Sequence, residues 1–176
     1  MDVDDTDLPE VKLLRPDVHG DARGQLAELF RADRFAEAGL PAGFVQDNLS
    51  HSAEAGTVRG LHYQVGPHVQ GKLVIALTGA LLDVAVDLRR DSPGFGRHAA
   101  VELTAARWRA LWVPEGFAHG FCTTAPGTTV LYKLTAPFAP ALERGVAWDD
   151  PAIGIAWPVA PAAAILSDKD RRWPRL

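Results

Sequence analysis

Two of the six histidines in this 176-residue chain stand in local contexts that favour chemistry. His62 lies in the run RGLHYQ, beside Arg59, and Lys72 follows shortly after it in the run QGKLV; His119 ends the run PEGFAH. An imidazole can take up and return a proton near neutral pH, and a fixed cation can stabilise a developing negative charge. His62 is therefore a candidate general base, although a buried histidine that only bonds to the backbone is the alternative interpretation.

The spacing Pro-x-Gly-x-x-His, which ends at His119, resembles the second motif of the cupin fold. In metal-binding cupins the first motif supplies His-x-His and then a glutamate. Here those places hold His62, Gln64 and Lys72. A lysine ammonium has three donors and no lone pair, so it cannot ligate a divalent metal. We expect a cupin cavity in which a positive charge replaces the metal, with no cofactor.

Most elements that must position these residues are predicted to be strands. Residues 73–77 and 81–88 flank a tight turn at Gly79, and residues 83–88 alternate polar and apolar as in a half-buried strand. Further strands are expected at 99–103, 108–113, 120–123 and 128–134, short helices at 31–38 and 104–108, and an irregular tail over the barrel at 157–164. This spacing predicts an all-β sandwich or jelly roll.

Composition narrows the classes of function. The length predicts one domain over residues 1–176. The net charge is −4 with no basic run, which argues against nucleic-acid binding. A single cysteine, Cys122, excludes an intramolecular disulfide and suits a reducing cytoplasm. The acidic N-terminal residues do not resemble a signal peptide, and no segment is apolar enough to span a bilayer. We expect a cytoplasmic protein without membrane or nucleic-acid partners.

Several motifs in a fixed order resemble the dTDP-4-dehydrorhamnose 3,5-epimerase family. They are RGLHYQ (59–64), QGKLV (70–74), DVAVDLRRDSPGFG (83–96), WVPEGFAHGF (112–121), ERGVAWDDP (143–151), IAWP (155–158) and LSDKD (166–170), and the match runs from about residue 21 to residue 170. The resemblance implies a cupin-type jelly roll, or double-stranded β-helix, in a homodimer that exchanges N-terminal strands. It also implies a cofactor-free epimerase that inverts carbons 3 and 5 of dTDP-4-keto-6-deoxyglucose on the way to L-rhamnose.

The resemblance also implies a role for four catalytic residues. His62 would be the base and Asp170 the carboxylate that orients it, as in other His–Asp pairs. Lys72 would stabilise the enolate oxygen, and Tyr132 would donate a proton to the opposite face of the sugar ring. Each also has a structural interpretation: a solvated C-terminal charge for Asp170, a surface lysine for Lys72 and a buried strand tyrosine for Tyr132.

Residues that match ligand-contacting positions of the family are mostly polar. Arg23 and Arg59 are expected to hold the diphosphate, because planar guanidinium groups suit phosphate oxygens. The other matching positions, each of which could instead serve at the surface or as a cap, are Glu28, Gln46, Asp47, Asn48, His119, Glu143 and Lys169.

One departure affects the predicted outcome. Phe138 stands where the family often has a second tyrosine. Relatives that invert only carbon 3 or only carbon 5 serve antibiotic deoxysugar pathways, so a single-centre epimerase is the first alternative. A ketoisomerase would move the ketone from carbon 4, a metal-dependent cupin enzyme would contain metal, and a non-catalytic sugar-binding jelly roll would exchange no deuterium with its ligand.

Overall fold

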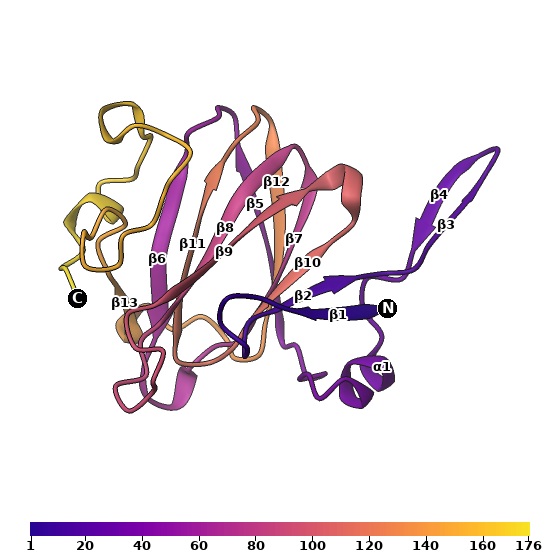
Figure 1. Cartoon of the computed structure of the whole chain (residues 1–176), viewed down its shortest axis with the longest axis horizontal. Coiled ribbons are helices and arrows are strands. Elements are labelled where there is room, and N and C mark those ends of the chain that lie inside the picture. The colour runs from indigo at the N-terminus through magenta and orange to yellow at the C-terminus, as the bar shows by residue number, and fades with distance from the viewer.

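The computed structural model describes all of residues 1–176 and consists mainly of two antiparallel sheets that face each other (Figure 1). The first sheet has the strand order β1 (Asp2–Asp5), β2 (Lys12–Arg15), β10 (Ala110–Val113), β7 (Lys72–Thr78), β12 (Thr128–Leu134), β5 (Gln46–Ser52). The second has the order β13 (Glu143–Gly145), β6 (Val58–Gln64), β11 (Phe117–Thr123), β8 (Ala80–Asp87), β9 (His98–Thr104). The expected all-β jelly-roll class is confirmed.

The main core lies between the inner faces of the two sheets. Val74, Leu111 and Val130 from the first sheet pack with Leu81 and Phe121 from the second in one cluster of buried residues. Side chains of a strand point alternately to its two faces, so each strand contributes every second residue to this core. The cluster fills one part of the barrel, and polar residues occupy the rest of the interior.

Strand β8 is covered on both faces. Val84 and Val86 face outward and pack against Val146 and Ile153 of the C-terminal segment. The opposite face carries Asp83, which is fully buried, in alternation with Leu81 and Ala85 of the main core. The expectation of a half-buried strand is therefore wrong, because a later segment of the chain covers the outer face and the polar positions point into the barrel.

The tight turn at Gly79 is present, and its φ of 70° is a conformation that favours glycine. The strands that it joins do not pair as a hairpin, however. β7 bonds to β10 and β12 in the first sheet, whereas β8 bonds to β9 and β11 in the second. The turn thus carries the chain from one sheet to the other.

Irregular segments and one short helix cover the outside of the barrel. The helix α1 (Ala32–Glu37) buries Phe35 against the first sheet, and confirms the helix expected at 31–38. The region 104–108 contains only a short 3-10 turn, Ala105–Arg107, and further 3-10 turns span Gly66–His68, Pro140–Leu142, Pro161–Ala163 and Asp170–Arg172. Residues 157–164 are irregular, as expected, and no helix is long and apolar enough to cross a membrane.

A hairpin of β3 (Val18–Asp21) and β4 (Gly24–Ala27) projects away from the barrel, as Figure 1 shows at its upper right. Its side chains are largely exposed, including Leu26, which is 71% exposed. The sequence pattern did not predict this hairpin or the strands β1, β2, β5, β6 and β13, because none of them has a clear apolar alternation. The structure confirms the expected strands β7 to β12 to within three residues, and the largest difference is that β11 begins at Phe117 and not at residue 120.

Candidate active site

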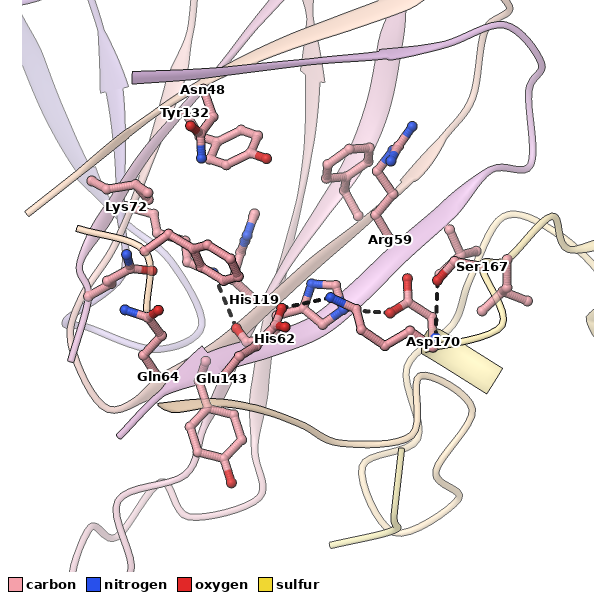
Figure 2. A pocket seen from close by; sticks show the side chains of 18 of the residues that line it. Asn48, Arg59, His62, Gln64, Lys72, His119, Tyr132, Glu143, Ser167 and Asp170 are labelled. Atoms are coloured by element: carbon pink, nitrogen blue, oxygen red, sulfur yellow. Dashed lines mark hydrogen bonds and ion pairs between the residues drawn. The ribbon is translucent and has the colours of Figure 1, made fainter. Parts of the chain in front are cut away.

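A cavity of about 700 Å³ opens between the two sheets and the C-terminal segment (Figure 2). β5, β7 and β12 supply the wall from the first sheet, and β6, β11 and β13 supply the wall from the second. Nine of the predicted site residues line it: Asn48, Arg59, His62, Lys72, His119, Tyr132, Glu143, Lys169 and Asp170. Six strands and the C-terminal segment, far apart in the sequence, therefore bring these candidate residues together as expected.

His62 and Asp170 form a hydrogen-bonded pair at one end of the cavity. His62 Nε2 lies 2.6 Å from Asp170 Oδ1, and the backbone N–H of Asp170 donates to Ser167 Oγ at 3.1 Å. A carboxylate can only accept, so Nε2 carries the proton and Nδ1 keeps its lone pair. Nδ1 has no partner in the protein. The pair therefore presents an imidazole that is oriented on one side and free to accept a proton on the other.

Asp170 is held in its ionised form. Its side chain is 5% exposed, and burial alone would raise its pKa. The hydrogen bond and charge of His62, together with donors from Trp173 and the Gly60 backbone, outweigh burial, so that the pKa is lowered overall. Asp170 can thus stabilise the imidazolium that forms when His62 accepts a proton.

Lys72 is buried at the beginning of β7, with only 8% of its surface exposed. Its Nζ donates to the backbone carbonyl of His62 at 3.2 Å. Burial lowers its pKa to about 8, and the nearby charges of Asp83 and Glu143 oppose that effect in part. Near neutral pH the group is still mainly an ammonium ion, in a site where water screens its charge poorly.

A second buried pair joins His119 of the cavity wall to Asp83. His119 Nε2 lies 2.7 Å from Asp83 Oδ1, and neither side chain is more than 7% exposed. Burial lowers the pKa of His119, and Asp83 only partly compensates, which favours the neutral imidazole. The other oxygen of Asp83 is buried without a hydrogen-bond partner. His119 can therefore accept a hydrogen bond from a ligand at Nδ1 without adding a full charge.

Tyr132 approaches the cavity from the opposite sheet. It lies on β12, which pairs with β7 and β5, whereas His62 lies on β6 of the second sheet. Figure 2 shows its ring directed into the cavity with the hydroxyl toward the open space, and that hydroxyl has no hydrogen bond to the protein. A base and a potential acid thus face one cavity from two sides.

Polar residues near the cavity mouth are already paired. Lys169 Nζ donates to Glu143 Oε1 at 2.8 Å, and the Arg59 guanidinium donates to Ser52 Oγ at 3.3 Å and to the carbonyl of His51 at 3.1 Å. Each pair is partly exposed, so a ligand can compete for these groups.

Four predicted binding residues do not line the cavity of their own chain. Arg23 is on the tip of the projecting hairpin, paired with Asp21, and its side chain is 89% exposed. Glu28 lies just after that hairpin, within 3.7 Å of Arg31. Asp47 is bound to Lys133 at 2.8 Å. Gln46 does not line the cavity itself, but its amide donates to Oδ1 of the lining residue Asn48 at 2.9 Å.

Other residues of the site were not predicted. Gln64 is buried, donates to the carbonyls of His68 and Pro137 and accepts from the Ala139 backbone, so it fixes the loop that carries Phe138. Its position two residues after His62 could have predicted this placement, because residues two apart on a strand point to the same face. Trp173, which contacts Asp170, gave no signal in the sequence. No group of three or more His, Cys, Asp or Glu side chains is arranged to hold a metal ion.

Comparisons with known proteins agree on one family. The sequence profile described as dTDP-4-dehydrorhamnose 3,5-epimerase matches residues 5–176. An epimerase of that name from Sinorhizobium fredii is 50% identical over 169 residues, which cover 96% of this chain and 86% of the relative. The crystal structure of the Bacillus anthracis enzyme, with TDP and pyrophosphate bound, is 46% identical, covers 99% of both chains and has a TM-score of 0.96. A Legionella pneumophila epimerase in complex with dTDP-4-keto-L-rhamnose is 40% identical with a TM-score of 0.94, over 99% of this chain and 92% of that one.

Proposed function

The chain belongs to the dTDP-4-dehydrorhamnose 3,5-epimerase family, and we propose how its own residues perform the reaction of that family. The protein is an isomerase that inverts carbons 3 and 5 of dTDP-4-keto-6-deoxyglucose through enolate intermediates, in the biosynthesis of L-rhamnose. The observation that supports the assignment of roles is the placement of His62 and Tyr132 on opposite walls of one cavity, with the Lys72 ammonium bonded to the backbone carbonyl of His62.

His62 acts as the general base. Its Nδ1 accepts the proton from a carbon next to the ketone, and the C–H bonding electrons move to the carbonyl oxygen to give an enolate. Asp170, bonded to Nε2, stabilises the imidazolium that results. The electron count is balanced without an oxidant or a reductant, because the reaction only relocates a proton.

Lys72 stabilises the enolate. Proton removal from carbon 3 or from carbon 5 places the negative charge on the same oxygen, so one cation serves both steps. A buried, preset cation is worth more than a solvated one, because it does not reorganise as the charge develops. Lys72 fits this role because it is buried and bonded to the backbone of the base itself.

Tyr132 returns a proton from the other side of the ring. A phenol is a weak acid, but the enolate carbon needs only a nearby donor on the face opposite the base. The free hydroxyl of Tyr132 on the first-sheet wall satisfies this requirement. Transfer of one proton to His62 and of another from Tyr132 inverts the carbon, and solvent then restores both side chains.

The polar residues around His62, Lys72 and Tyr132 bind the substrate. Arg59 supplies a guanidinium for the diphosphate, while Asn48, His119, Glu143 and Lys169 offer hydrogen bonds to the sugar and the nucleoside. Phe138, which lines the cavity and is 45% exposed, provides an apolar face but no hydroxyl. That missing hydroxyl is the one feature in favour of a single-centre outcome.

We also propose a homodimer in which the β3–β4 hairpin reaches the partner's cavity. Arg23 and Glu28 match ligand-binding positions of the family, yet the hairpin directs them away from their own cavity (Figure 1). Exposed Leu26 and Val18 on the same hairpin provide apolar area for a partner to cover. Such a dimer would give each site a second arginine for the diphosphate.

Intersubunit complementation tests this dimer. We expect His62→Ala and Arg23→Ala homodimers each to have low activity, and refolded mixtures of the two to regain activity, because one site of a mixed dimer then has both residues. A mixture as inactive as its parents would show that Arg23 does not act across a dimer. Sedimentation velocity supplies the oligomeric state of each sample.

We propose further that residues 1–176 form one catalytic domain that acts in the cytoplasm. The single barrel core and the buried, unpaired Cys122 support this proposal.

The proposed activity is tested with dTDP-4-keto-6-deoxyglucose and the purified protein. We expect NMR coupling constants of the product ring to report inverted configurations at carbons 3 and 5, with His62→Ala as the inactive control. An unchanged ring, or a ketone that has left carbon 4, would overturn the assignment.

A further inference from the structure

Trp173 contacts the His62–Asp170 pair from behind the cavity. Its indole Nε1 donates to Asp170 Oδ1 at 3.3 Å, and this is the same oxygen that accepts from His62 at 2.6 Å. Its ring also meets the imidazole edge-on, with centroids 6.0 Å apart and an interplanar angle of 68°. Trp173 is not among the residues that line the cavity, so its contacts are with the pair and not with the cavity space.

The position of the indole is fixed by the backbone around it. Trp173 lies against Gly145 of β13, where any side chain larger than hydrogen would collide with the indole ring. Gly145 pairs with His62 across the two strands, so the indole and the base share one scaffold. The Ala147 N–H donates to the carbonyl of Pro174 at 2.7 Å, and the Leu176 N–H donates to Asp150 Oδ2 at 2.6 Å. These bonds anchor the chain after Trp173.

His62 and Trp173 both donate a hydrogen bond to the same oxygen, Asp170 Oδ1. The second oxygen of Asp170 has only a long contact, 3.5 Å from the Gly60 backbone nitrogen. The indole N–H is a donor that cannot accept a proton, so its bond persists whichever form His62 takes. A carboxylate shared in this way is held in one orientation and attracts the imidazolium less strongly than an unshared one.

We propose that Trp173 is a positioning residue for the base: it fixes the orientation of Asp170, limits the negative charge available to His62 and covers the pair from solvent. The proposal rests on the role of His62 and Asp170 given above. It adds a residue that acts through that pair and not through the substrate.

The expected signature is a change in pH dependence. In Trp173→Phe the ring remains but the N–H donor is gone, so all the charge on Oδ1 is available to the imidazolium of His62. The acid limb of the kcat/KM profile should therefore move to higher pH, by about half a pH unit for a hydrogen bond of ordinary strength. kcat at pH 6.5 should fall by about twofold to tenfold, and KM should stay near the wild-type value.

The other charged groups around the pair remain in place in this variant. Arg59, Lys72, His119, Tyr132, Glu143 and Lys169 line the cavity beside His62, and Asp149 and Arg171 share a second, smaller cavity with Asp170. Lys169 Nζ also lies 6.0 Å from the indole centroid, a distance that a phenyl ring preserves approximately.

Trp157→Phe provides the matched control. Trp157 is also half-buried, and its indole donates to the carbonyl of Trp148 at 2.7 Å, away from the base. We expect this variant to lose a comparable amount of thermal stability without a shift of the acid limb. If Trp173→Phe had the same acid limb as wild type, or if Trp157→Phe shifted it equally, the proposal would be overturned.

Two further measurements keep the outcome decisive. If Trp173→Phe does not fold, the indole N–H resonance of Trp173 in the wild-type protein should change with pH in step with the acid limb. An indole resonance that does not change across this transition would refute the coupling of Trp173 to the His62–Asp170 pair. Full activity in His62→Ala would overturn the assigned base itself, whereas an inactive His62→Ala with a wild-type-like Trp173→Phe would remove only the role of Trp173.

Discussion

Replacing Lys72 with methionine should make the protein more stable and nearly inactive. Lys72 is 8% exposed, and burial lowers its pKa from 10.5 to about 8. That gap corresponds to roughly 3 kcal/mol by which the ammonium form opposes folding near neutral pH. The folded-state pKa lies below the unfolded one, so this cost is fully present below about pH 8 and disappears as the pH rises to 10.5.

The net gain should be smaller than this electrostatic cost. Methionine also loses the hydrogen bond from Nζ to the carbonyl of His62, worth about 1 kcal/mol. We therefore expect Lys72→Met to raise the free energy of unfolding by about 2 kcal/mol at pH 7, or the Tm by about 4–8 °C for a chain of this size. Near pH 10.5 Lys72→Met should be slightly less stable than wild type, because the cost of burying the charge has disappeared and only the loss of the hydrogen bond remains.

The same change should remove the enolate stabiliser. We expect kcat to fall by about a hundredfold to a thousandfold, equally for deuterium exchange at carbon 3 and at carbon 5. Thermal unfolding at fixed protein concentration and NMR-monitored exchange in heavy water measure the two effects. Lys12→Met removes a partly exposed ion pair with Asp5 and serves as the control, with activity retained.

Two results would refute the reasoning about Lys72. A less stable Lys72→Met protein at pH 7 would mean that its attraction to Asp83 and Glu143 exceeds the cost of burial. Normal exchange at one carbon and poor exchange at the other would mean that Lys72 is not the shared stabiliser.

Two further predictions concern the base and the missing hydroxyl. His62→Ala should lower the turnover rate by about a hundredfold to ten-thousandfold while calorimetry finds dTDP binding nearly unchanged, because we assign the diphosphate to Arg59 and proton transfer to His62. Retention of most of the activity would exclude His62 as the base. Phe138→Tyr restores the phenol that the family often has, so any centre that wild type inverts slowly should be inverted faster, as product NMR can measure. An unchanged ratio of the two rates would show that this hydroxyl does not limit the second centre.

The sequence predicted which residues share the cavity better than it predicted which strand faces are buried. His62 and Tyr132 were expected to transfer protons and Lys72 to stabilise negative charge, and all three side chains line one cavity. The alternation of Asp83 with valines was interpreted as a half-buried strand, which would place Asp83 on the solvent-exposed face. The period of the alternation is the same whichever face is buried. Only the later packing of Val146 and Ile153 against the valines shows that Asp83 points inward.

The other features that the sequence did not predict depend on contacts between distant segments of the chain. Gly79 predicted a turn correctly, but a turn residue does not specify whether its strands pair or enter different sheets. Arg23 was placed among the ligand contacts by resemblance, and the hairpin that directs it away from its own cavity has no hydrophobic signature. Trp173 stands in a basic, Pro-containing tail without periodicity, so the sequence does not predict its bond to Asp170.

Deuterium exchange by Tyr132→Phe tests most directly whether acid and base act from opposite walls. The variant keeps the ring but loses the acidic proton, while His62 and Lys72 still form the enolate and the base can return a deuteron to the face it came from. In heavy water, we expect deuterium to enter the substrate at carbons 3 and 5 with unchanged configuration, while inverted product falls sharply. Inversion at the wild-type rate in Tyr132→Phe would contradict the account, because some other group would then deliver the second proton.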